Sequence, residues 1–200
     1  MAENQIVIFG GSFNPPLNSH FSIAQDLLNE YKEINKVIFV PVNSKYEKPG
    51  LINNEDRYNM LKLVCDKNKK FDVSRVEIDS ERPLYTIETL NYFDKKYPNN
   101  EILFLMGSDN LKEFPTWNGA DKICEKYKSY VFRRNDDNIK NIIEKDKFLS
   151  KNKNSLVVVS NNTLNNFSST YARKIIKEDK SIRYLAPDEV VNYIEKHKLY

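Results

Sequence analysis

The stretch IVIFGGSFNPPLNSH, residues 6–20, decides the fold of this chain. Its first four residues form an apolar run typical of a buried strand, and Gly10 and Gly11 break the run before a helical pattern begins. His20, one of only two histidines, falls in the first turn of the predicted helix. A strand that ends in glycines and continues into a helix directs backbone N–H groups and the positive end of the helix dipole at one place. We therefore expect an anion such as phosphate to bind there.

The loop by itself is weak evidence for a phosphate site. It matches neither GxxxxGK(S/T) nor GxGxxG, the glycine patterns of two standard phosphate-binding loops. The alternative is a glycine turn that only allows tight packing of strand on helix, with His20 capping or packing.

Length and composition indicate a single domain. The chain has 200 residues, of which 40% are hydrophobic, enough for a sizeable core. We expect one domain over residues 1–200, with a C-terminal helical part at about 168–200. The 31 basic and 28 acidic residues leave a net charge of only +3, too little to imply a nucleic acid or a membrane as partner. Any anion site must therefore be local.

The two cysteines, Cys65 and Cys124, lie far apart and form no CxxC pair. The sequence also lacks a His/Cys cluster with the spacing of zinc ligands, so we expect reduced, packing cysteines and no dedicated protein metal site. No apolar run approaches the ~20 residues of a membrane span, and no targeting segment is evident. The expected location is the cytoplasm.

Short apolar or β-branched runs alternate with segments of helical spacing, such as residues 21–31 and 58–65. This alternation predicts an α/β fold with a Rossmann-like, doubly wound, mostly parallel sheet and helices on both faces. Residues 135–154, rich in Lys, Asp and Asn, predict one exposed amphipathic helix with polar flanks. The predicted strands are Ile6–Phe9, Val37–Val40, Val73–Ile78, Ile102–Met106, Tyr130–Phe132 and Leu156–Val159.

Polar segments follow most of these predicted strands. In doubly wound sheets, ligands bind beyond the carboxyl ends of the strands, where the strand order reverses. We therefore expect the chemistry at this edge of the sheet. The segments concerned are 14–20, 43–48, 107–109, Arg133-Arg134 and 168–170.

A second candidate phosphate motif covers residues 166–173, NFSSTYAR. Ser168 can cap the following helix, and Ser169 and Thr170 then present hydroxyl groups at its positive end. Arg173 follows one turn later and can reach the same anion. A plain helix cap would explain Ser168 alone. Together with residues 6–20, this motif predicts a polyphosphate clamp built from two helix N-termini.

These motifs resemble those of the pyridine-nucleotide adenylyltransferases. Residues 11–20, GSFNPPLNSH, are similar to the family's eukaryotic GSFNPxTNxH loop and its bacterial GG(S/T)FDPxHxGH loop. FSSTYAR and the C-terminal residues 181–200 resemble the family's ISSTxxR motif and its RYLVPxxVxxYIxxxxLY ending. Three intermediate blocks, at 56–61, 82–90 and 106–117, fall in the family's order and spacing, so the resemblance covers nearly the full length.

The resemblance implies an enzyme of NAD biosynthesis that joins nicotinate or nicotinamide mononucleotide to the AMP part of ATP and releases pyrophosphate. ATP would bring Mg²⁺, held largely by its own phosphates. His20, Lys48 and Arg173 match the positions implied in catalysis, and the pyridine ring would lie against Tyr85, Thr86 and Trp117. The residues implied in ATP binding are Gly10, Gly11, Ser12, Phe13, Asn14, His20, Gly107, Asp109, Ser168, Ser169, Thr170 and Arg173. Trp117 as a simple packing residue is the alternative.

Two positions depart from the family pattern. Leu17 replaces a histidine or threonine that could donate a hydrogen bond to phosphate, so activity could be much reduced. We hypothesise that the side-chain amides of Asn14 and Asn18 replace this donor. Pro41 and Lys48 keep the spacing of the family's PxxxxPHK loop, but the residues between them differ, so Lys45 is an alternative to Lys48.

Two other functions remain open from the sequence. One is a nucleotide-binding or regulatory protein that lost turnover through Leu17, and the other is a related transferase with a different phosphate acceptor. The sequence also leaves open the choice between nicotinate and nicotinamide and the oligomeric state, a homo-oligomer included.

Overall fold

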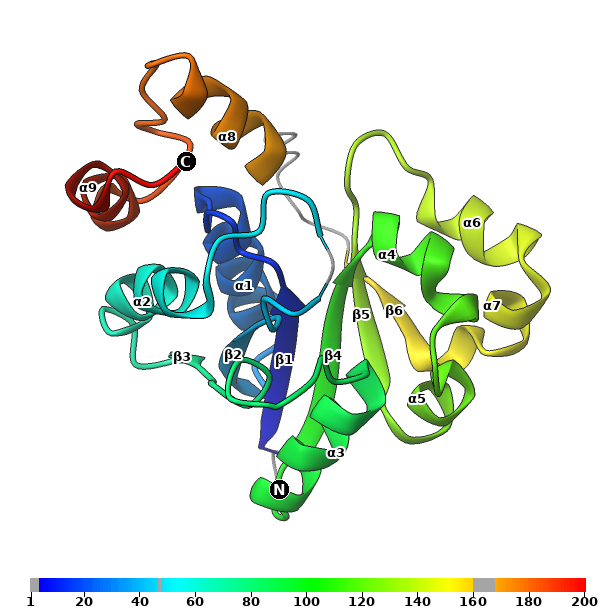
Figure 1. Ribbon diagram of the computed structural model, residues 1–200. Helices are drawn as coiled ribbons and strands as arrows, with labels where there is room; N and C mark the ends of the chain where they lie inside the picture. The colour runs from blue at the N-terminus through cyan, green and yellow to red at the C-terminus, as the bar shows by residue number, and fades with distance from the viewer. Residues whose placement is uncertain (1–3, 47, 160–167) are drawn as a thin grey trace.

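Six strands form one sheet in the computed structural model, which describes residues 4–46, 48–159 and 168–200 (Figure 1). Their order across the sheet is β3-β2-β1-β4-β5-β6, and each pair among them is parallel. This order is that of a doubly wound sheet, so the predicted fold class is confirmed. The strands are β1 Gln5–Gly11, β2 Ile34–Pro41, β3 Phe71–Val73, β4 Glu101–Gly107, β5 Lys128–Phe132 and β6 Leu156–Val158.

Helices connect these strands and extend the chain beyond β6. Side-chain caps mark several helix starts: Asn53 Oδ1 accepts a hydrogen bond from Asp56 N, and Ser168 Oγ accepts one from Tyr171 N. The helices of the described residues are α1 Asn18–Glu30, α2 Asn54–Cys65, α3 Thr86–Lys96, α4 Ser108–Glu113, α5 Ala120–Lys126, α6 Ile139–Lys145, α7 Lys147–Lys151, α8 Ser169–Lys177 and α9 Asp188–His197, with 3-10 turns at Phe114–Thr116 and Lys153–Ser155. Within this part of the chain, none combines the length and apolar composition that crossing a bilayer requires.

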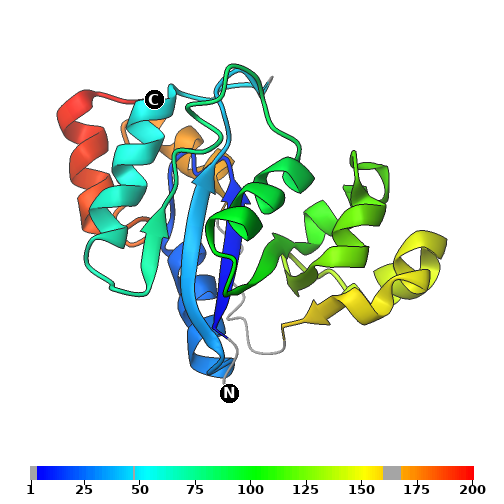
Figure 2. The ribbon, with the colours of Figure 1, turned by 90° about the horizontal axis from the view of Figure 1, so that it is seen from below.

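Alternating residues of β1 face opposite sides of the sheet and belong to two separate cores. Ile6 and Ile8 pack with apolar residues of α3 and α5, whereas Val7 and Phe9 pack with those of α1 and α2. In Figure 2, α2 lies to one side of β2 and α3 to the other. Burial on both faces is typical of parallel strands, and it leaves only the ends of the strands for a ligand.

The two C-terminal helices, α8 and α9, form a third core with the start of α1. Leu17 is completely buried there, next to Met60 of α2 and among apolar residues of α8 and α9. Tyr193 Oη donates a hydrogen bond of 2.9 Å to Asp56 Oδ1, which joins α9 to α2. Figure 2 shows these two helices alongside each other. The C-terminal part is thereby attached to the loop that follows β1.

The third strand differs from the prediction. Strand β3 ends at Val73, where the predicted run Val73–Ile78 begins, so most of that prediction is wrong. The residues beyond Val73 form turns, because Asn43 Nδ2 donates hydrogen bonds to the carbonyls of Glu77 at 3.0 Å and Ser80 at 2.8 Å. A short apolar run does not by itself distinguish a strand from another buried segment.

Residues 135–154 also differ from the prediction, because they form two short helices instead of one. Helix α6 ends before Asp146, whose Oδ1 accepts a hydrogen bond of 2.9 Å from Leu149 N and starts α7. Ile139, Ile143 and Leu149 are buried in the core against the sheet. The prediction of an amphipathic segment is confirmed, whereas the prediction of one exposed helix is wrong.

Candidate active site

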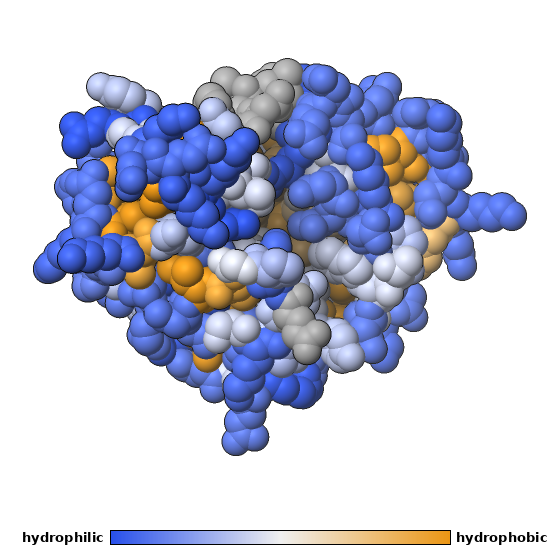
Figure 3. Space-filling model, turned by 45° about the horizontal axis from the view of Figure 1, so that its top comes forward, coloured by the Kyte–Doolittle hydropathy of each residue, from blue (hydrophilic) through white to orange (hydrophobic). Residues whose placement is uncertain are grey.

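A cavity of about 780 Å³ opens at the carboxyl ends of β1 and β4. Figure 3 views the molecule from the side of this edge and shows a hollow near its middle, rimmed mostly by hydrophilic side chains. All the residues that the sequence predicted for the site line this cavity, although their individual roles stay predictions. They are Gly10, Gly11, Ser12, Phe13, Asn14, His20, Lys48, Tyr85, Thr86, Gly107, Asp109, Trp117, Ser168, Ser169, Thr170 and Arg173.

The two candidate phosphate motifs meet at one end of the cavity. Ser169 Oγ donates a hydrogen bond of 2.9 Å to the carbonyl of Pro15, and Arg173 donates one of 2.8 Å to the carbonyl of Asn14. Residues 166–167 of the second motif lie outside the described residues. The convergence of the two motifs, which the sequence predicted across more than half of the chain, is therefore present in the fold.

His20 is held as a neutral imidazole. The backbone N–H of Leu17 donates a hydrogen bond of 2.9 Å to Nδ1, which assigns the ring proton to Nε2. The rings of Phe13 and Phe9 lie beside it, with centroid distances of 5.2 Å and 6.3 Å. Burial, followed by the positive charge of Arg134, lowers the pKa of His20 from 6.5 to about 3. Its Nε2–H can therefore donate a hydrogen bond to an anion in the cavity without adding a charge.

The structure separates the two candidate lysines. Lys48 Nζ donates a hydrogen bond of 2.9 Å to Ser12 Oγ at the cavity wall, whereas Lys45 Nζ donates one of 2.6 Å to the carbonyl of Glu81. Burial and the charge of Arg173 lower the pKa of Lys48, because several cations gather at this end of the cavity. The geometry favours Lys48 as the phosphate-binding lysine.

Arg134 lines the same end of the cavity. The sequence pattern placed Arg133-Arg134 at this edge of the sheet but gave Arg134 no role in binding or catalysis. Its Nε lies 3.9 Å from Asp109 Oδ2, and its backbone N–H donates a hydrogen bond of 2.9 Å to Ser108 Oγ. Gly107 makes this placement possible, since a Cβ there would lie 2.8 Å from Arg134 Cδ. The available signal was its position just after the fifth strand, at the edge where the other site residues lie.

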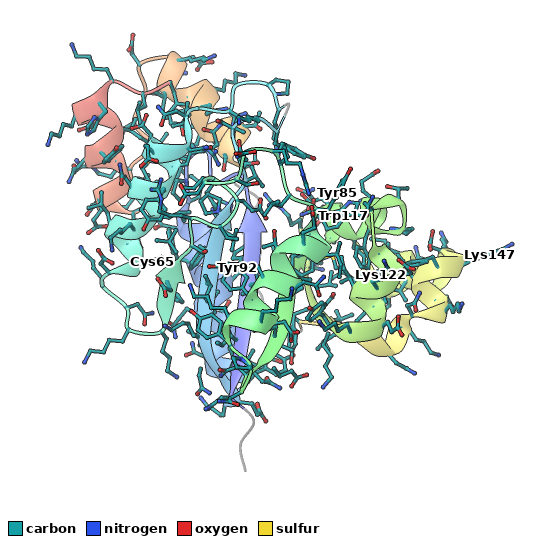
Figure 4. The ribbon with its side chains drawn as sticks, turned by 60° about the horizontal axis from the view of Figure 1, so that its bottom comes forward. Cys65, Tyr85, Tyr92, Trp117, Lys122 and Lys147 are labelled. Carbon is teal, nitrogen blue, oxygen red and sulfur yellow. The ribbon has the colours of Figure 1, made fainter. Side chains whose placement is uncertain are left out.

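Tyr85, Thr86 and Trp117 line the other end of the cavity. Tyr85 N donates a hydrogen bond of 2.9 Å to Glu88 Oε2, which fixes the first turn of α3. The Trp117 ring packs edge-on against Phe114, with centroids 5.5 Å apart. Figure 4 shows Tyr85 and Trp117 together near the start of α3. Two aromatic side chains at this place suit a flat ring.

A buried cation, Arg57, lies behind the loops that follow β1 and β2. These loops border the end of the cavity where the two candidate phosphate motifs meet, which we call the phosphate end. Arg57 is completely buried and donates hydrogen bonds to the carbonyls of Ser12 (3.1 Å), Val42 (2.6 Å) and Ile52 (3.1 Å) and to Asn54 Oδ1 (2.8 Å). Among the described residues, no carboxylate forms an ion pair with it. Burial lowers the pKa of Arg57 to about 10, which leaves it charged. Arg57 therefore joins the loops after β1 and β2 to the start of α2.

Leu17, the main departure from the family pattern, does not line the cavity. Its side chain packs with the C-terminal helices, on the other side of the loop. Asn14 Nδ2 donates a hydrogen bond of 2.7 Å to the carbonyl of Gly50, and Asn18 Nδ2 donates one of 2.9 Å to that of Tyr184. Both amides thus hold the loop in place, and their use as substitute phosphate donors stays a prediction.

The cavity also contains a buried acid that the sequence analysis did not single out. Glu77 Oε1 accepts a hydrogen bond of 2.8 Å from Thr89 Oγ1. Burial raises the pKa of Glu77 from 4.5 to about 7, against the opposing effects of the Thr89 hydrogen bond and of Arg57. No pattern in the sequence marks this residue, because the run that contains it was interpreted as a strand.

We expect Arg57→Lys to lower the free energy of unfolding by at least about 2 kcal/mol. A lysine keeps the charge but cannot reach four acceptors on three segments, so buried carbonyls lose their partners. Denaturant unfolding measures the change. Arg75→Lys is the matched control, since Arg75 pairs with Glu55 and Asp79 at a partly exposed site and the expected loss is below about 1 kcal/mol. Equal losses in the two variants would contradict this role for Arg57.

We expect His20 to stay neutral in the folded protein from about pH 8 down to about pH 5. Its C2–H proton resonance should not move over this range, whereas the unfolded chain should titrate near the ordinary value of about 6.5. The folded pKa lies below the unfolded one, so the stability linked to His20 is complete above about pH 6.5 and falls as the pH drops towards 3. A midpoint above about pH 5 in the folded protein would refute the neutral assignment.

Comparisons with known proteins agree with the geometry. The cytidylyltransferase-like family model matches residues 8–175. A probable nicotinate-nucleotide adenylyltransferase of Caldicellulosiruptor bescii is 37% identical, and one of Cytophaga hutchinsonii is 33% identical, with 98% of each chain covered in both cases. The structure of the nicotinic acid mononucleotide adenylyltransferase of Plasmodium falciparum complexed with NaAD has a TM-score of 0.80 at 22% identity, and the match covers 98% of this chain and 97% of that one. End-to-end similarity at this level shows that the chain belongs to the nicotinate-nucleotide adenylyltransferases, within the cytidylyltransferase-like family.

Proposed function

We propose that the protein transfers the adenylyl group of ATP to nicotinate or nicotinamide mononucleotide, giving the dinucleotide and pyrophosphate. The observation that supports this most is that one cavity is lined both by cationic side chains, Lys48, Arg134 and Arg173, and by the aromatic side chains of Tyr85 and Trp117. The first suits the phosphates and the second suits a pyridine ring. Family membership and the NaAD complex of the Plasmodium falciparum relative point to the same reaction.

In this reaction, the phosphate of the mononucleotide attacks the α-phosphorus of ATP and pyrophosphate leaves. The protein has to position two anionic reactants and stabilise the charge that develops, and it needs no covalent nucleophile. Lys48 and Arg173, which both bond to the loop after β1, supply positive charge, and His20 supplies a directed, neutral hydrogen bond. The loop N–H groups after β1 complete the anion site.

We further propose that Mg²⁺ enters with ATP. Within the described residues, no three His, Cys, Asp or Glu side chains are placed to hold a metal ion, and the phosphate end is lined by cations. This donor set fits an ion that is coordinated mainly by the ATP phosphates and by water. Asp109, whose Oδ2 lies 3.9 Å from Arg134 Nε, is one carboxylate that lines the cavity. The ion would neutralise phosphate charge during the transfer.

The direct test is formation of dinucleotide from ATP, Mg²⁺ and each mononucleotide in separate reactions, with pyrophosphate measured in parallel. We expect both products to appear in equal amounts with at least one acceptor. Binding of the nucleotides without either product would instead show a binding protein. Pyrophosphate release that needs some other phosphate compound would show a transferase with a different acceptor.

We expect Lys48→Met to lower kcat/KM by about tenfold or more, because one cation near the phosphates is lost. Lys45→Met removes the same charge from the same loop and should change kcat/KM by less than about twofold, since Lys45 bonds to the carbonyl of Glu81. Steady-state kinetics with ATP as the varied substrate measure both effects. The assignment is wrong if the two variants lose activity equally or if Lys45→Met loses more.

A further inference from the structure

The proposed adenylyl transfer gives no role to the buried carboxyl group of Glu77. Glu77 is 8% exposed and lines the cavity. Only one of its carboxylate oxygens, Oε1, accepts a hydrogen bond from a side chain of the described residues, that of Thr89. A buried acid in a site for two anionic nucleotides needs an explanation, because its charge opposes theirs.

The position of Glu77 places it at the ring end of the cavity. Thr89 lies one turn after Thr86 in α3, so both face the same side of the helix. Asn43 fixes the segment that carries the acid, through its hydrogen bonds to the carbonyls of Glu77 and Ser80. Glu77 is therefore bonded to a residue one helical turn after Thr86, in the cavity that Tyr85 and Trp117 also line.

The two ends of the cavity have opposite charge preferences. Lys48, Arg134 and Arg173 line the end that suits phosphate, whereas Glu77 lies at the aromatic end. A pyridine mononucleotide has the same polarity, because its phosphate is negative and the ring nitrogen, bonded to the ribose, makes the ring a cation. The face of Trp117 also attracts a positive charge.

On the basis of the proposed function, we propose that Glu77 determines acceptor specificity by binding the positive charge of the pyridinium ring. The carboxylate favours mononucleotides with a charged ring over those with an uncharged one. Both the nicotinate and the nicotinamide compound contain this ring cation. The carboxylate of nicotinate cancels it in net charge, so the preference is stronger for the nicotinamide compound. Mononucleotides with an uncharged base or with a reduced dihydropyridine ring are disfavoured.

The ionisation of Glu77 then sets a pH dependence with a defined sign. Arg57, across the interior in α2, is the charged group whose field reaches Glu77 and favours its ionised form. The pKa of Glu77 is raised to about 7 by burial, so the carboxylate fraction grows as the pH rises through neutrality and preference for the charged ring strengthens. Among the other charged side chains of the surrounding described segments, Arg75 pairs with Glu55 and Asp79, Arg82 pairs with Glu88, and Lys45 donates to the carbonyl of Glu81. Glu113 also lines the cavity.

The test compares the pyridine mononucleotide that the enzyme accepts with its 1,4-dihydropyridine form, which has the same ribose phosphate and the same ring substituent but lacks the positive charge of the ring nitrogen. The readout is the ratio of the Ki or KM of the reduced form to the KM of the oxidised form. Titration of the phosphate and of other protein groups affects both ligands and cancels in this ratio. Glu77→Gln keeps an oxygen for Thr89 and removes the charge, and Glu81→Gln makes the same charge change on the exposed surface of the same segment.

We expect the wild type and Glu81→Gln to prefer the charged ring by at least about fivefold at pH 8 and by less at pH 6.5. Glu77→Gln should show a ratio near one at both pH values. If Glu77→Gln gives the same ratio as the wild type, the inference about Glu77 is overturned. The proposed function still stands in that case, provided that the wild type forms the dinucleotide. If the wild type forms no dinucleotide with either acceptor, the proposed function and the inference about Glu77 are both wrong. If Glu77→Gln does not fold, a wild-type ratio near one at pH 8 overturns the inference alone.

Discussion

Burying a cation is costly when, as among the described residues here, no carboxylate contacts it, and Arg57 offsets this cost with four hydrogen bonds to fixed acceptors. Three of these acceptors are main-chain carbonyls, of Ser12, Val42 and Ile52, from segments that are separate in the sequence. A planar guanidinium satisfies them only when all three segments lie in one relative position. The geometry of the phosphate end therefore depends on the chain closing around this one side chain.

The same loop is held from its other side by the C-terminal part of the chain. Asn14 accepts a hydrogen bond of 2.8 Å from Tyr200 Oη at its side chain and one of 2.8 Å from Arg173 at its carbonyl. Leu17, at the end of the loop, packs into the apolar core of α8 and α9. Arg57 and the C-terminal helices thus fix the loop before any ligand binds, and such preorganisation is what positioning two anions requires. A leucine at position 17 fits this arrangement because its environment is apolar.

Much of this architecture could be predicted from local sequence patterns. The apolar run of β1, the glycines that follow it and the Ser168 cap depend on neighbouring residues, so they could be predicted, and the sheet topology brings the two motifs together. The role of Arg57 depends on Ser12, 45 positions away, and that of Glu77 on Thr89, 12 positions away. Such pairings arise only after folding. The strand predicted over residues 73–78 failed for the same reason, because the side chain of Asn43, 34 positions away, donates a hydrogen bond to the carbonyl of Glu77 within it.

The low pKa of His20 is consistent with the positive charges that surround it at this end of the cavity. Lys48, Arg134 and Arg173 line one end of the cavity, and a protonated imidazole among them would add repulsion to the cost of burial. The hydrogen bond from Leu17 N to Nδ1 can form only with the unprotonated nitrogen, so it favours the same neutral form. The flexible side chains of the lysine and arginines supply positive charge, and the fixed imidazole of His20 supplies a hydrogen-bond donor of set orientation. Under the proposed function, the cations would attract a highly charged nucleotide, and the imidazole would add one uncharged donor that the Leu17 hydrogen bond holds in place.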